Sequence, residues 1–169
     1  GIVAIDETNS CVWGAIDVDE YQLDLKDLAI KIAKQKLPLV LCRSKSGGAH
    51  LYIFLNEPIA ATMLQRKLRQ IAASIGYGQA EIFPKQTKLL LDRGDRGSTL
   101  NMPYFGGENS TRYAYGDEGQ ALTPEEFLNY TQTIELTPSQ LEKLEASPLT
   151  ESVEWLDQAP PCIQHLIVQ

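Results

Sequence analysis

The sequence predicts one α+β domain, in which an antiparallel or mixed sheet carries helices packed on one face. Short apolar runs alternate with two longer segments of helical periodicity along the first hundred residues. The 169 residues suffice for a single domain with a sizeable core. An apolar content of 43%, with 12 glycines and 9 prolines, is typical of an ordered globular chain.

The first strand and helix are predicted from the spacing of apolar residues. Residues 12–16 form an apolar run that predicts a buried strand leading into Asp17. Residues 21–36 are expected to form an amphipathic helix that ends before Pro38. Its apolar face contains Leu25, Leu28 and Ile32.

A hairpin and a second helix follow. Residues 39–42 and 50–55 are predicted strands joined by a turn at 43–48, with His50 at the mouth of the hairpin. Pro58 is expected to open a helix that runs to Ile75 and is ended by glycines. The residues expected to face inward are Leu64, Leu68, Ile71 and Ile75, and the terminating glycines are Gly76 and Gly78.

The remaining elements are shorter. Residues 80–83 predict a strand broken at Pro84, 87–98 a polar loop, and 99–105 an extended return. Thr123 and Thr137 each begin a capping box with proline at the first helical position, so two short helices are expected in an acidic tail. A third helix is expected at 151–157.

Bulk properties exclude several classes of protein. No apolar run approaches the ~20 residues of a membrane span, and acidic residues begin at Asp6 without a preceding basic segment, unlike a signal peptide. Cys11, Cys42 and Cys162 are widely spaced, which disfavours a disulfide framework or a zinc site. We therefore expect a cytoplasmic protein without zinc.

Charge is distributed unevenly along the chain. Residues 26–96 contain thirteen Lys and Arg against five acids, whereas residues 97–169 contain two against eleven. Such asymmetry bears on partners rather than on fold. The basic segments are solvated helix faces or, alternatively, part of an anion-binding surface.

Two stretches in the basic and preceding segments have the composition of a nucleotide site. Asp17 and Asp19 share one face of a strand, because residues i and i+2 point the same way, and paired carboxylates favour Mg²⁺ or Mn²⁺. The turn at 43–48 is basic and rich in hydroxyls and glycine, a composition that can hold phosphates. Its candidate phosphate contacts are Arg43, Lys45, Ser46, Gly47 and Gly48, followed by His50.

Four motifs occur in a specific order: WGAIDVD at 13–19, RSKSGGAH at 43–50, AEIFPKQ at 80–86 and GSTLNMPYF at 97–105. Together they resemble the archaeo-eukaryotic primase superfamily, especially the primase-polymerases of phages, plasmids and conflict-system (TOTE-like) operons. The resemblance implies a core built on a modified RNA-recognition-motif-like sheet. It assigns residues 1–130 to a catalytic core whose N-terminal part is truncated, and residues 131–169 to a short helical tail leading toward a missing C-terminal module.

The resemblance also implies roles for individual residues. Asp17 and Asp19 become ligands of a two-metal Mg²⁺ or Mn²⁺ site, and Glu81 completes it as the third acid. Asp92, which also follows an apolar run, is the rival third acid. His50 becomes a catalytic contact to the nucleotide phosphates. Further nucleotide contacts are expected from Lys85 and Asn101, and Tyr104 belongs either to the core or to the template contact.

The implied activity is that of a DNA primase or DNA-directed polymerase, which joins NTPs or dNTPs on a single-stranded DNA template and primer. Helicase or nuclease domains in the full-length protein or operon are the expected partners, in a bacterial, phage or plasmid cytoplasm. Two alternatives remain open. One is a non-catalytic nucleic-acid-binding module for replication initiation, and the other is a sugar-nucleotide transferase, which also uses Asp-x-Asp with Mn²⁺.

Overall fold

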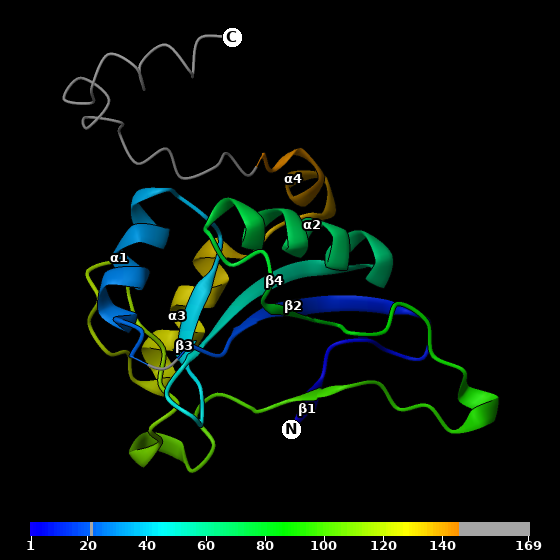
Figure 1. Ribbon diagram of the computed structural model, residues 1–169, viewed down its shortest axis with the longest axis horizontal. Helices are drawn as coiled ribbons and strands as arrows, with labels where there is room; N and C mark the ends of the chain where they lie inside the picture. Colours follow the sequence, from blue (N-terminus) through cyan, green and yellow to red (C-terminus); the bar gives the residue numbers. More distant parts are fainter. Residues whose placement is uncertain (21, 146–169) are drawn as a thin grey trace, which may run out of the picture.

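The computed structural model describes residues 1–20 and 22–145, and its centre is a four-stranded antiparallel sheet in the order β3-β4-β2-β5 (Figure 1). The strands are β2 (Ser10–Val18), β3 (Val40–Arg43), β4 (Ala49–Ala60) and β5 (Glu81–Phe83). Helices α1 (Leu25–Lys34) and α2 (Ala61–Ser74) connect β2 to β3 and β4 to β5. This β-α-β-β-α-β order confirms the predicted α+β class.

Both helices cover the same face of the sheet (Figure 1). From β2, Ile16 and Val18 point into this layer and are buried. The predicted inward faces of both helices are confirmed, because all of their residues are buried in one cluster. These residues are Leu25, Leu28 and Ile32 of α1, Leu64, Leu68 and Ile71 of α2, and Ile75 after α2. Burying apolar surface contributes about 25 cal/mol of free energy for each Å². This layer is therefore the main source of stability.

The opposite face of the sheet carries a smaller, aromatic cluster. Tyr52 and Phe83 are buried there, and Trp13, Phe54 and Phe127 are partly buried against them. The chain after β5 supplies the cover, through β6 (Thr99–Leu100), which pairs with β1 (Ile2–Val3), and through helix α3 (Pro124–Ile134). This face therefore has a buried centre and aromatic side chains that remain partly exposed to solvent.

Three short elements complete the described chain. They are the 3-10 helices η1 (Leu91–Arg93) and η2 (Gly107–Asn109) and helix α4 (Pro138–Lys143). Both predicted capping boxes are confirmed, because Thr123 and Thr137 cap α3 and α4 with reciprocal bonds from Glu126 and Gln140. The helix expected at 151–157 lies outside the described residues.

The prediction that Pro58 opens a helix is wrong. Pro58 lies within β4, and α2 begins at Ala61. The pairing of β2 with β4 shifts register between Cys11 and Trp13, so Pro58 falls in the irregular stretch between the two runs of paired residues. Proline is tolerated there because no ladder hydrogen bond is required of its nitrogen.

Other predicted boundaries change as well. Helix α1 begins at Leu25 rather than at residue 21, because Asp24 caps it by accepting a hydrogen bond from the Asp27 N–H at 2.9 Å. The segment 99–105 is extended only at its start. Tyr104 has a φ of 51°, and a turn then leads into η2. None of the helices in the described ranges is long and apolar enough to cross a membrane.

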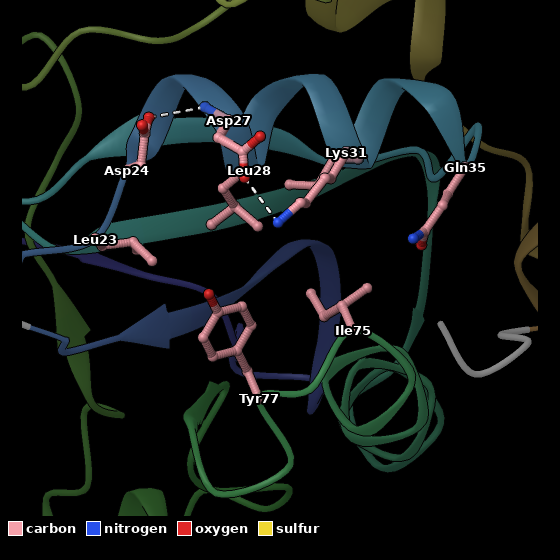
Figure 2. Close-up of a pocket in the computed structure, with 9 residues that line it drawn as sticks. Leu23, Asp24, Asp27, Leu28, Lys31, Gln35, Ile75 and Tyr77 are labelled. Atoms are coloured by element: carbon pink, nitrogen blue, oxygen red, sulfur yellow. Dashed lines mark hydrogen bonds and ion pairs between the residues drawn. The ribbon is translucent and has the colours of Figure 1, made fainter. Parts of the chain in front are cut away.

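A cavity of about 150 Å³ lies between α1 and the segment that follows α2 (Figure 2). Its apolar lining includes Leu28, Ile75 and Tyr77, and Lys31 pairs with Asp27 at 2.7 Å on its rim. Burial raises the pKa of the Tyr77 hydroxyl. The apolar lining thus brings residues of α1 and of the segment after α2 to one cavity, whereas the salt bridge lies within α1.

Gly14 tests the packing of α2 on β2. A Cβ there would lie 2.7 Å from the Leu68 Cδ1 and 2.7 Å from the Phe83 carbonyl oxygen. We expect Gly14→Ala to lower the free energy of unfolding by about 1–3 kcal/mol, the usual cost of overpacking. Urea denaturation measures this. Gly78→Ala is the matched control, because its nearest contact is an ordinary 3.5 Å; equal losses in both variants would contradict the packing argument.

Candidate metal and nucleotide site

Three predicted site residues form a row across neighbouring strands. Asp17 of β2 is paired with His50 of β4 on one side and with Glu81 of β5 on the other. Directly paired residues point to the same face of a sheet. The row therefore lies on the aromatic face, opposite α1 and α2, although its members are far apart in the sequence.

Asp17 is the least satisfied polar group of this row. Its Oδ1 lies 3.4 Å from His50 Nε2, and both side chains are largely buried, with 15% and 6% exposed. The contact does not have hydrogen-bond geometry, and Asp17 Oδ1 is buried without a hydrogen-bond partner among the described residues. Because an unpartnered buried oxygen is costly, this atom fits a site that a cation would complete.

Asp17, Asp19 and Glu81 line the same cleft, which has a volume of about 390 Å³. Asp19 follows the end of β2, is exposed, and accepts a hydrogen bond from Ser46 Oγ at 3.4 Å. Ser46 therefore connects the predicted phosphate turn to the second predicted metal ligand. Asp17, Asp19 and Glu81 thus share one cleft.

The acids do not form a closed ligand cluster. Within the described ranges, no three His, Cys, Asp or Glu side chains gather where they could hold a metal ion. Glu81 is 61% exposed and pairs with Lys85 Nζ at 2.5 Å. Carboxylates crowded together repel one another, so a salt bridge to lysine is a favourable alternative for Glu81. Lys85, predicted to contact phosphate, is thus paired with the predicted third acid.

The rival acid, Asp92, lies elsewhere. It belongs to η1, which is green at the right of Figure 1, whereas β2 ends on the left, next to α1. The segment before η1 is attached to the start of β2, because the Leu89 N–H donates to Asn9 Oδ1 at 2.6 Å. This geometry favours Glu81 over Asp92 as the third acid.

The turn at 43–48 is held together by its own hydrogen bonds. The Ser44 N–H donates to the Gly48 carbonyl at 2.8 Å, and the Gly47 N–H donates to the Ser44 carbonyl at 3.3 Å. Gly47 has a φ of 99°, and a Cβ on Gly48 would lie 2.3 Å from the Val18 carbonyl oxygen. The backbone of the turn therefore accounts for the glycine at both positions. The Gly47 N–H already donates a hydrogen bond within the turn.

The basic residues of this turn differ in their freedom. Arg43 is half-buried, and its Nη1 donates to the Thr111 carbonyl oxygen at 3.3 Å, which attaches the turn to the later chain. Lys45 is exposed. The side chain of Lys45 and the hydroxyl of Ser46 are thus the parts of the turn that a phosphate reaches most readily.

Tyr52 is a site residue that the sequence reasoning missed. Its hydroxyl lies 3.3 Å from His50 Nδ1 and donates to the Asn101 carbonyl oxygen at 3.1 Å. Burial, then Cys42 and Asp17, raise the pKa of Tyr52 far above its ordinary value. The position was detectable, since residues i and i+2 of a strand share a face. Asn101 is thus connected to the site through its backbone.

An apolar groove of about 370 Å³ continues the same face of the sheet beyond Tyr52. Met102 and Leu128 on its rim are 46% and 59% exposed. Tyr104 lines it while its hydroxyl donates to the Leu122 carbonyl at 2.8 Å and accepts from the Ala114 N–H at 2.9 Å, so Tyr104 also belongs to the core. The aromatic members of the groove are Trp13, Tyr52, Phe54, Tyr104 and Phe127.

The unpartnered carboxylate oxygen predicts an unusual effect on stability. Asp17→Asn removes a buried charge and offers an N–H donor toward His50, so we expect the free energy of unfolding in EDTA to rise by roughly 1 kcal/mol. Thermal or urea denaturation measures this. Asp19→Asn, at an exposed position, should change stability little. A clear loss of stability in Asp17→Asn would mean that the carboxylate is a stabilising partner of His50.

Comparison with known proteins identifies the family of the chain. A search among curated proteins finds no match. The family model described as the archaeo-eukaryotic primase domain of the TOTE conflict system matches residues 1–144, which include every strand and helix of the described structure. The chain therefore belongs to the archaeo-eukaryotic primase domains of TOTE conflict systems.

Proposed function

We propose that this domain catalyses template-directed nucleotidyl transfer, as a primase or polymerase that joins NTPs or dNTPs on single-stranded DNA. The observation that carries the proposal is the row His50–Asp17–Glu81, with Asp19 and the turn at 43–48 beside it. Membership of a primase family supports the reaction class. The proposal includes both ribonucleotides and deoxyribonucleotides as substrates, and single-stranded DNA as the template.

Asp17, Asp19 and Glu81 are the residues that would hold divalent cations. Bound Mg²⁺ or Mn²⁺ would neutralise the triphosphate and favour ionisation of the attacking hydroxyl. For Glu81, binding a cation requires release of Lys85, which then becomes available to the triphosphate. This exchange reconciles the salt bridge with the predicted roles of both residues.

In the proposed reaction, a 3′-oxygen attacks the α-phosphorus of the incoming nucleotide. A new phosphorus–oxygen bond forms while the bond from the α-phosphorus to the β-phosphate oxygen breaks, and pyrophosphate leaves. The proton of the 3′-hydroxyl passes to solvent. Lys45, Ser46 and His50 orient the triphosphate, so that catalysis consists mainly of positioning and electrostatic stabilisation.

The groove beside the site offers a place for bases of the template or primer. Aromatic rings stack on bases without regard to their sequence. His50, Tyr52 and Phe54 occupy every second position of β4 and therefore share one face of the sheet. The groove and the candidate phosphate site thus lie along the same strand. We propose that single-stranded DNA lies along this strand.

Primer extension on a single-stranded template tests the proposed reaction, with Mg²⁺ or Mn²⁺ and with each nucleotide set. We expect metal-dependent products that are lost when both Asp17 and Asp19 are changed to Ala. Products that persist in this double variant would refute the assignment. A folded protein that binds DNA independently of metal and gives no product would support the non-catalytic module instead, and the Glu81–Lys85 salt bridge is the observation that favours it.

The third acid has its own test. We expect Glu81→Gln to reduce extension by about 100-fold or more, as expected when one charge-stabilising group of a phosphoryl-transfer site is removed. Asp92→Asn is the matched control and should retain near-normal extension, because η1 lies away from the cleft. The opposite pattern would assign the role to Asp92.

Base stacking is measured separately, by binding of a labelled single-stranded oligonucleotide in EDTA. We expect Phe54→Ala to weaken binding by about 1–3 kcal/mol, the usual contribution of one stacked base. Leu91→Ala removes an apolar side chain that is 49% exposed in η1, outside the groove, and serves as the control. Equal affinity of the Phe54 variant and the wild type would place the DNA elsewhere.

A further inference from the structure

We infer that Tyr52 is a positioning residue that fixes the His50 ring as its Nδ1–H tautomer and leaves Nε2 to face Asp17. The argument begins with the one hydroxyl hydrogen of Tyr52. It is donated to the Asn101 carbonyl oxygen at 3.1 Å, since a carbonyl oxygen accepts and does not donate. Toward His50 Nδ1, at 3.3 Å, the tyrosine oxygen therefore acts as the acceptor.

An accepting oxygen requires a hydrogen on Nδ1. A neutral imidazole carries one N–H, so Nε2 of a neutral His50 has a lone pair. That lone pair faces Asp17 Oδ1 at 3.4 Å. Because this contact lacks hydrogen-bond geometry, a hydrogen on Nε2 would gain no bond to Asp17 that could offset the one made through Nδ1.

The surroundings keep this arrangement in place. His50 and Tyr52 are 4% and 1% exposed, and their rings meet edge to face with centroids 6.0 Å apart. Tyr52 also stacks on Phe54 and contacts Trp13. The hydroxyl that orients His50 is thus itself held by the aromatic cluster and by the segment of GSTLNMPYF that contains Asn101.

The consequence for the site rests on the proposed function. With Nδ1 occupied by Tyr52, Nε2 is the ring atom directed at Asp17. Its lone pair cannot donate to a phosphate oxygen, so His50 would act on the triphosphate through a cation held at Asp17. Partners that orient a site histidine through its second nitrogen are a recurring feature of such centres. Tyr52 would thereby connect the motif at 97–105 to the acids of β2.

Nitrogen NMR of the histidine rings tests this directly, because the two tautomers differ in which ring nitrogen carries hydrogen. The chain has two histidines, so His50 and His165 give the complete set of ring signals, and His165→Gln assigns them. At a pH where the His50 ring is neutral, we expect the hydrogen on Nδ1. A wild-type spectrum with the hydrogen on Nε2 would overturn the inference without any variant at Tyr52.

Tyr52→Phe tests whether the hydroxyl is the cause. Without it, Asp17 Oδ1 is the acceptor that remains beside the ring, so we expect the hydrogen to move to Nε2. Tyr130→Phe is the matched control, since it removes another hydroxyl of the same aromatic cluster, one that donates to Asp117 and lies outside the groove. An unchanged tautomer in folded Tyr52→Phe would assign the orientation to another group.

The same two variants separate this inference from the proposed function. If the domain is a polymerase, Tyr52→Phe should lower kcat/KM for nucleotide addition by about 10-fold or more, and Tyr130→Phe should lower it less. Tautomers that behave as expected in a protein without polymerase activity would uphold the positioning role and refute the function. Polymerase activity with an Nε2–H ring in the wild type would do the reverse.

Discussion

The pairing of β2 with β4 and β5 at Asp17 is the interaction on which the candidate site depends. Alternation along β2 sends Ile16 and Val18 into the helix-covered core and Asp17 to the other face. A slip of one residue would bury the carboxylate among aliphatic side chains and expose the core residues. The hydrophobic pattern that stabilises the sheet therefore also fixes which side of it bears the acids.

The sequence was sufficient for the fold class and for most elements, because apolar periodicity and capping residues act locally. It failed at Pro58, where a register irregularity between two distant strands permits a proline inside β4. It also failed at Tyr104, whose positive φ ends the extended segment. Such features depend on pairing partners that a local pattern does not specify.

The sequence likewise indicated some residues of the candidate site and missed others. Strand alternation placed Asp17 correctly, but Asp19 lies just after the end of β2 and lines the cleft from outside the strand. Glu81 was proposed from a family resemblance, and it lies in register opposite Asp17. The preference for Glu81 over Asp92 rests on which end of the sheet each occupies, which the sequence pattern does not specify. Tyr52 was missed because it lies outside the four motifs. The salt bridge between Lys85 and Glu81 was missed because Lys85 had been assigned to the nucleotide and Glu81 to a metal ion.

The order of the strands has a consequence for folding. β2 is made early in the chain, but β5, which lies beside it, is contributed only after β3, β4 and α2. Contacts between segments so far apart are slow to form, because the intervening loop must first be closed. Glu81 therefore comes beside Asp17 only when β5 pairs with β2, so an intact row of His50, Asp17 and Glu81 requires both neighbours of β2 to be in place.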